Sequence, residues 1–190
     1  RADLMKGGSF GGREFANETL IHNPVVFVHG VSQVAGGMMK TAAEYYKSKD
    51  NYTDAELYGT TYDNPEYDKF KWIKYTMNCE HVKRIRFLIE AVHGYTGKPV
   101  DVVAFSLGVP ISRKAIIGGR CVENKEYVGQ AITNIMGTYI GVSGPNKGVA
   151  PVVGIMGIPQ TLCAMSPLIP VCNPIDGLFS GLCPFKSRFI

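Results

Sequence analysis

The sequence predicts an α/β fold in which a mostly parallel sheet is flanked by helices. Apolar runs such as PVVFVHG (24–30) and VDVVAF (100–105) are typical of buried strands. Residues 79–95 repeat apolar side chains at spacings of three and four, as an amphipathic helix does. The 190 residues, 45% hydrophobic and 19% charged, are enough for a single globular domain. Strands that alternate with helices favour a parallel sheet with right-handed connections.

The other elements follow from the same patterns and from the positions of glycine and proline. We expect strands at 24–30, 55–62, 100–105 and 136–143, and helices at 38–47, 79–95 and about 107–117. Pro110 falls in the first turn of the last helix, where its missing N–H costs nothing. Gly118 and Gly119 would end that helix.

Residues 149–183 form an apolar segment of a different kind. Its prolines and glycines, among them Pro151, Pro159, Pro167 and Pro170, would break a membrane-spanning helix, so we expect no transmembrane segment. An irregular excursion over the carboxyl edge of the sheet fits better. It would be a lid or an acyl-binding wall, with a plain buried loop as the alternative.

A candidate nucleophile, Ser106, lies between a predicted strand and a predicted helix. In the pentapeptide Ala104-Phe105-Ser106-Leu107-Gly108, the residues two before and two after the serine are small. A sharp strand-to-helix turn requires this, because it holds the serine in a strained conformation with its hydroxyl above the sheet. The alternative is a serine that merely caps the helix at an ordinary turn.

Acyl transfer also needs two backbone N–H groups directed at the tetrahedral oxyanion. The residue after the nucleophile, Leu107, would supply one of them. The other is expected from Val31, which follows the early strand in the stretch His29-Gly30-Val31. Gly30 would let the backbone approach closely.

Four segments together resemble the class 2 lipases of the α/β-hydrolase superfamily, most closely their secreted nematode branch: NPVVFVHGVSQ, AELYGTTYD, VDVVAFSLGVPISRKAIIGG and GVSGPNKG. The resemblance implies an α/β-hydrolase fold and hydrolysis of lipid esters at a lipid–water interface by Ser, His and Asp, without metal or cofactor. It assigns Ser106 as the nucleophile and the Val31 and Leu107 amides as oxyanion donors. Ala104 fits the family pattern, whereas Phe105 replaces its usual histidine.

The histidine of the triad is missing from its expected place. The superfamily order is nucleophile, acid, histidine, yet His22, His29, His81 and His93 all precede Ser106. His81 is expected at the surface. The resemblance implies that His29 shapes the oxyanion loop, with Gly30, Ala104 and Gly108 as further supporting residues, and His29 as a substitute base is the alternative. We therefore expect the chain to be truncated, so that the sheet is incomplete at its C-terminal end and these residues alone are inactive.

The carboxylates after Ser106 do not supply a clear acid. Glu123 and Glu126 precede the strand at 136–143 and are expected at the edge of the sheet away from the site, and Asp176 lies in a turn-like NPIDG. Two alternatives to an active lipase follow. One is a catalytically inactive, lipase-like protein that binds lipid, and the other is a different serine acyl enzyme on the same scaffold.

The cysteines and two glycosylation sequons, at Asn17 and Asn51, favour a secreted glycoprotein with disulfides. The topology predicts that Cys79 and Cys121 lie at opposite edges of the sheet. Cys79, if it is paired, would then pair with Cys163, Cys172 or Cys183, and Cys121 would be unpaired or have its partner beyond Ile190. The net charge of +4 is scattered along the chain, so no nucleic-acid partner is expected.

Overall fold

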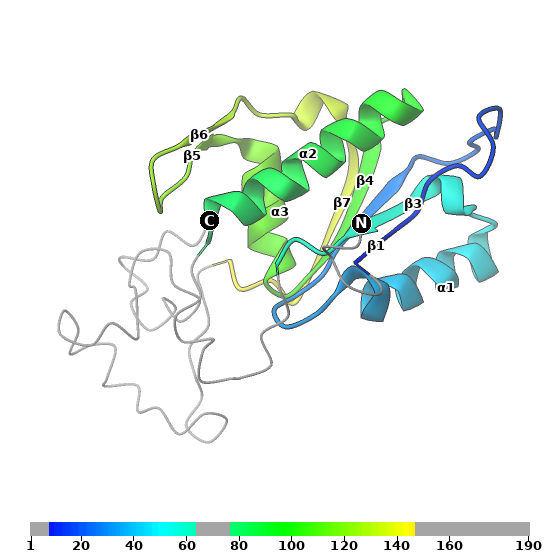
Figure 1. The fold of residues 1–190 in the computed structure, drawn as a ribbon, viewed down its shortest axis with the longest axis horizontal. Helices are drawn as coiled ribbons and strands as arrows, with labels where there is room; N and C mark the ends of the chain where they lie inside the picture. The colour runs from blue at the N-terminus through cyan, green and yellow to red at the C-terminus, as the bar shows by residue number, and fades with distance from the viewer. Residues whose placement is uncertain (1–7, 64–76, 147–190) are drawn as a thin grey trace, which may run out of the picture.

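The computed structural model describes residues 8–63 and 77–146. Within them, five strands form one sheet in the order β1 (Ser9–Phe10), β3 (Leu57–Thr60), β2 (Val25–Val28), β4 (Val100–Phe105) and β7 (Met136–Val142), as Figure 1 shows. β1 is antiparallel to β3, and the other neighbouring pairs are parallel. The predicted α/β class with a mostly parallel sheet is confirmed.

Helices cover both faces of this sheet. On one face, Val25 and Phe27 of β2 pack with Met39 and Ala43 at α1 (Lys40–Asp50). The alternate residues of β2 pack on the other face, in the cluster that includes α2 (Cys79–Thr96) and α3 (Gly108–Ile117). β2 is therefore buried on both sides, which explains its unbroken apolar run. Among the described residues, no helix combines the length and apolar character needed to cross a membrane.

Every predicted strand and helix is found, with ends that shift by a few residues. Residues 55–62 begin with a 3₁₀ turn (Asp54–Glu56) before β3, and a π-type turn (Ala35–Met39) precedes α1. The sequence did not predict β1, nor the hairpin of β5 (Gly119–Arg120) and β6 (Tyr127–Gly129). The apolar segment 149–183 and Asp176 lie outside the described residues.

The predicted cysteine pairing is wrong, because Cys79 and Cys121 form a disulfide with their Cα atoms 5.7 Å apart. The prediction assumed that the chain stays at the far edge after α3. Instead, α3 ends beside the middle of α2, where Arg86 Nη1 donates a hydrogen bond to the Ala115 carbonyl oxygen at 3.1 Å. Gly118 and Gly119 both adopt positive φ, and β5 leads the chain back toward the first turn of α2.

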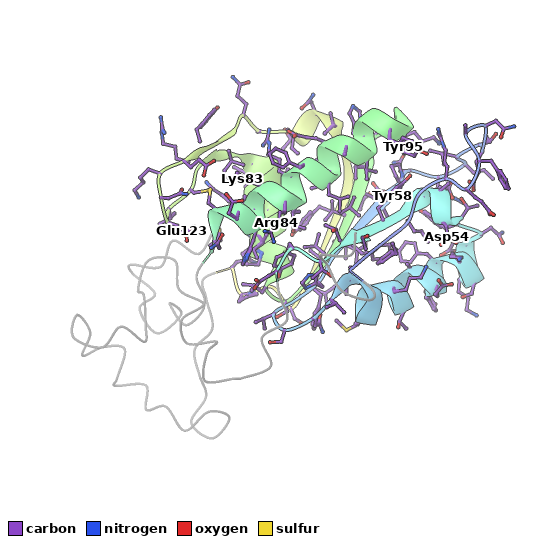
Figure 2. The ribbon with its side chains drawn as sticks, in the orientation of Figure 1. Asp54, Tyr58, Lys83, Arg84, Tyr95 and Glu123 are labelled. Carbon is purple, nitrogen blue, oxygen red and sulfur yellow. A yellow bond between two sulfur atoms is a disulfide. The ribbon has the colours of Figure 1, made fainter. Side chains whose placement is uncertain are left out.

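The same reversal corrects the expected position of Glu123. Its carboxylate accepts a hydrogen bond from the backbone N–H of Cys79 at 2.8 Å, and Figure 2 shows it beside the first turn of α2. A helix between parallel strands begins at their carboxyl edge, so Glu123 lies at that edge. A carboxylate at the positive end of a helix is stabilising, which gives Glu123 a structural role there.

Candidate active site

Ser106 lies at the turn between β4 and α3 in a backbone conformation that is unusual for serine. Its φ is +51°, in the left-handed region that residues with a Cβ atom rarely adopt. The surrounding hydrogen bonds hold this conformation: the Ser106 N–H donates to the Val142 carbonyl oxygen at 2.9 Å, and the Val109 N–H donates to the Ser106 carbonyl oxygen at 3.0 Å. The strain is therefore imposed by β7 on one side and by α3 on the other.

The small residues flanking Ser106 fill positions where a larger side chain has no room. A Cβ atom on Gly108 would lie 2.5 Å from the His29 carbonyl oxygen and 2.6 Å from that of Val28. Ala104 is fully buried and pairs with Val28 in the sheet register. Leu107, which directly precedes α3, is 1% exposed, so its side chain anchors the turn while the first N–H groups of the helix have no partner within the helix.

The loop after β2 reaches the Ser106 turn. A Cβ atom on Gly30 would lie 3.0 Å from Ser106 Cβ and 3.3 Å from Phe105 Cδ1, so glycine permits this close approach. The Gly30 N–H donates to Gln33 Oε1 at 3.0 Å. Val31 is partly buried and packs against the core.

His29 is buried and has a partner at each ring nitrogen. Its Nδ1 lies 2.8 Å from the Gly30 carbonyl oxygen, and its Nε2 accepts a hydrogen bond from the Tyr62 N–H at 3.2 Å. These partners assign the proton to Nδ1, which donates to Gly30. Burial lowers the pKa of His29 to about 4, so the ring is neutral at pH 7. With Nε2 occupied, His29 shapes the loop and is not placed to accept a proton from Ser106.

The other three histidines have partners away from the Ser106 turn. His22 Nδ1 lies 3.2 Å from Glu56 Oε2, and His93 Nδ1 lies 2.8 Å from the Lys98 carbonyl oxygen. His81 Nε2 lies 3.3 Å from Asp63 Oδ1, with only 13% of the His81 side chain exposed. His81, expected at the surface, is thus partly buried, with its ring centroid 5.5 Å from that of Tyr62.

Two residues near the site were not assigned a role from the sequence. Tyr62 stacks on His29 with ring centroids 4.1 Å apart and an angle of 9° between the ring planes. Gln33 fixes the Gly30 amide. Both lie in segments quoted for the family resemblance, GTTYD and HGVSQ, but a side chain that acts on the loop backbone leaves no periodic or motif signal in one sequence.

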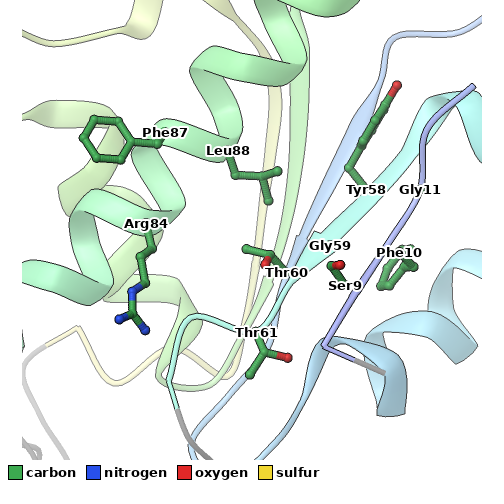
Figure 3. Close-up of a pocket in the computed structure, with 10 residues that line it drawn as sticks. All are labelled: Ser9, Phe10, Gly11, Tyr58, Gly59, Thr60, Thr61, Arg84, Phe87 and Leu88. Atoms are coloured by element: carbon green, nitrogen blue, oxygen red, sulfur yellow. The ribbon is translucent and has the colours of Figure 1, made fainter. Parts of the chain in front are cut away.

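A surface pocket of about 540 Å³ lies between α2 and the strands β1 and β3 (Figure 3). Its lining includes Phe10, Tyr58, Arg84 and Phe87, and it does not include Ser106 or the loop after β2. The pocket is therefore separate from the candidate active site. Within the described residues, no cluster of histidine, cysteine and carboxylate side chains is suited to hold a metal ion.

A mostly parallel sheet with a strained Ser106 turn at the carboxyl end of β4 defines a protein of the α/β-hydrolase type. The family model described as Lipase (class 2) matches residues 22–190. The chain belongs to this class 2 lipase family.

Two solved structures are similar to the chain. Lipase B of Aspergillus fumigatus is 13% identical over 76% of this chain, with a TM-score of 0.49. Lipase BlEst2 of Bacillus licheniformis, in its mature form, is 15% identical over 95% of this chain, also with a TM-score of 0.49. The chain spans 29% and 64% of the lengths of these two lipases. No curated protein matches the chain.

Proposed function

We propose that the protein is a serine carboxylic ester hydrolase that acts on lipid esters. Ser106 is the nucleophile, and the N–H groups of Val31 and Leu107 stabilise the oxyanion. The observation that carries this proposal is the left-handed Ser106 turn packed against Gly30, with Ser106 Cβ 3.0 Å from the position of a Cβ on Gly30. Membership of the class 2 lipase family supports a lipid ester as the substrate.

In the reaction, Ser106 Oγ attacks the ester carbonyl carbon while its proton passes to a general base. The carbonyl oxygen becomes an oxyanion that accepts hydrogen bonds from the two amides. The tetrahedral intermediate collapses to an acyl-serine, and the alcohol leaves with the proton from the base. Water then attacks the acyl-serine by the same route, releasing the fatty acid and restoring Ser106.

In this proposal, none of the four histidines in residues 1–190 acts as the general base. Each of the four histidines already has a partner, at Glu56, Gly30 and Tyr62, Asp63 or Lys98. A serine hydroxyl without a base is a poor nucleophile at neutral pH. Residues 1–190 alone are therefore expected to be inactive.

The test is active-site labelling of the full-length protein with a fluorophosphonate. We expect one adduct, on the peptide that contains Ser106, and a loss of ester hydrolysis of about 10⁴-fold or more in Ser106→Ala. Ser48→Ala is the matched control, because Ser48 lies on the exposed surface of α1 and donates only to the Tyr45 carbonyl oxygen. Labelling at another residue, or hydrolysis retained in Ser106→Ala, would refute the proposal.

A second candidate is a lipase-like protein that binds lipid without hydrolysing it. The observation that favours it is the engagement of all four histidines away from Ser106. The test is binding of the full-length protein to vesicles of phosphatidylcholine that contain triacylglycerol. Binding without hydrolysis of these lipids, and without labelling by the phosphonate, would identify this second function.

We also propose that the protein is secreted and glycosylated. The Cys79–Cys121 disulfide is typical of an oxidising compartment. Asn17 and Asn51, the first residues of the two sequons, are both exposed and accessible to a glycan. Expression in a eukaryotic secretory host, followed by enzymatic removal of N-glycans, should lower the mass of the protein. An unchanged mass would exclude glycosylation at both sites.

A further inference from the structure

Two consecutive peptide groups in the loop after β2 are held by side chains. The His29–Gly30 peptide has its carbonyl oxygen bound by the Tyr62 hydroxyl at 3.0 Å and its N–H bound by Gln33 Oε1 at 3.0 Å. The Gly30–Val31 peptide has its carbonyl oxygen bound by His29 Nδ1 at 2.8 Å. This peptide is trans, so its N–H points opposite to its carbonyl. The direction of the Val31 N–H is therefore set by the His29 ring.

The His29 ring is in turn held by Tyr62. The Tyr62 N–H donates to His29 Nε2 at 3.2 Å, and the two rings stack with their centroids 4.1 Å apart. Tyr62 is 1% exposed, so neither contact competes with water. The backbone N–H of Tyr62 thus fixes the tautomer of His29, and the stacked Tyr62 ring fixes the orientation of the His29 ring. The Tyr62 hydroxyl holds the His29 carbonyl oxygen.

Tyr62 itself is attached to α2. Arg84 projects from α2 toward the chain beyond Thr61 (Figure 3) and donates from Nη1 to the Tyr62 carbonyl oxygen at 2.7 Å. Asp63, the next residue, pairs with His81 in the first turn of α2 at 3.3 Å. The segment after β3 is thereby fixed between the helix and the loop.

We propose that Tyr62 is a positioning residue: its hydroxyl holds the His29–Gly30 peptide, and this orients the Val31 N–H of the next peptide. The inference rests on the proposed function, in which this N–H donates to the oxyanion. Loss of a whole oxyanion donor costs about 10² to 10³ in rate. A misdirected donor should cost part of this, without weakening the binding of the ester in its ground state.

The test compares Tyr62→Phe with Tyr58→Phe in the full-length protein. Tyr58 is a matched control: it is also buried, and its hydroxyl also donates to a backbone carbonyl, that of Ala55. We expect Tyr62→Phe to lower kcat about tenfold with KM within twofold, to weaken a boronic acid inhibitor in parallel, and to shift the Val31 amide resonance in NMR spectra. Tyr58→Phe should leave kcat and the Val31 resonance unchanged.

A Val31 resonance or a kcat that is unchanged in Tyr62→Phe overturns the inference, even if the melting temperature falls. If the wild-type protein hydrolyses no ester, the proposed function fails, and the Val31 resonance alone decides whether Tyr62 orients the loop. Arg84→Gln, on the surface of α2, tests the same route if Tyr62→Phe does not fold. Arg84→Gln should lower kcat and shift the Val31 resonance in the same direction as Tyr62→Phe, but by a smaller amount.

Discussion

Gly108 and His29 approach so closely that a Cβ atom on Gly108 would lie 2.5 Å from the His29 carbonyl oxygen. The contact joins the first residue of α3 to the end of β2, and the same carbonyl accepts the Tyr62 hydroxyl. The Ser106 turn and the loop after β2 therefore cannot move independently. Glycine at position 108 is a requirement of this contact.

Gly108→Ala is expected to lower the free energy of unfolding by about 1–3 kcal/mol, as overpacked substitutions do. It should also lower ester hydrolysis, because α3 and the loop after β2 must separate. Gly94→Ala is the control: a Cβ at this position in α2 would meet nothing within 4 Å. That change should stabilise the protein by up to about 1 kcal/mol. Urea unfolding of both variants measures the difference, and equal midpoints would contradict the prediction.

The sequence predicted the strands and helices well because each carries a periodic apolar pattern. The small residues Ala104 and Gly108 also predicted a sharp turn at Ser106, because such a turn leaves no room for larger side chains, and Ser106 has a φ of +51°. It failed where the path depends on single glycines: Gly118 and Gly119 reverse the chain through positive φ and bring Cys121 to Cys79. A glycine pair ends a helix whichever way the chain continues. The direction in which the chain leaves α3 is therefore set by tertiary packing, which the sequence pattern does not show.

The contribution of Tyr62 could not be predicted for a different reason. Its contacts with His29 join residues 33 positions apart and run partly through backbone atoms. Such hydrogen bonds depend on the relative position of β2 and β3, which is known only once the sheet register is known. Family resemblance indicated that His29 shapes the loop, but not what holds His29.

Removing the disulfide should destabilise the protein without changing its fold. The Cys79–Cys121 bond closes a loop with a sequence separation of 42, for which loop entropy gives about 4 kcal/mol. Both cysteines are buried, so alanine is the suitable replacement. The double variant Cys79→Ala/Cys121→Ala should lose about 2–4 kcal/mol in urea unfolding. Peptide mapping without reductant provides the direct check: a bond from Cys79 to Cys163, Cys172 or Cys183 would restore the pairing expected from sequence.

Glu56 is expected to stabilise the fold only while its carboxylate is ionised. The side chain is 1% exposed and accepts hydrogen bonds from the N–H groups of Ile21 at 2.6 Å, His22 at 2.7 Å and Thr53 at 3.0 Å. Burial alone would raise the pKa of this carboxyl, but the hydrogen bonds outweigh burial and lower the pKa. Its stabilisation is therefore present above the unfolded pKa and lost as the pH falls through the folded one.

Glu56→Gln replaces one acceptor oxygen with an amide that faces N–H donors. The variant should lose about 1–3 kcal/mol at pH 7. This loss in the free energy of unfolding should shrink as the pH falls below the unfolded pKa of glutamate, about 4.3, and through the lower pKa of folded Glu56. Glu14→Gln, at an exposed position, serves as the control and should leave the urea midpoint unchanged. If the free energies of unfolding of Glu56→Gln and wild type differ by the same amount down to pH 3, ionisation of Glu56 does not contribute to stability.

His29 predicts a second pH dependence, at higher pH. Burial lowers its pKa from 6.5 to about 4, while the Gly30 carbonyl and Asp63 oppose this shift and His81 adds to it. Between these two values the unfolded chain holds more protons than the folded one, so stability falls as the pH falls from 6.5 to about 4. At about 1.4 kcal/mol per pKa unit, the loss from His29 is about 3 kcal/mol.

NMR titration of the His29 ring measures this pKa directly, and unfolding in urea across the same pH range measures its consequence. His29→Gln, which cannot titrate, should be less stable than wild type at pH 7 but should show a flatter dependence between pH 6.5 and 4. Protonation of His29 would also remove the acceptor for the Tyr62 N–H, since both ring nitrogens become donors. The Val31 amide resonance should therefore shift with the same midpoint, and a midpoint near 6.5 would mean that the ring is open to solvent.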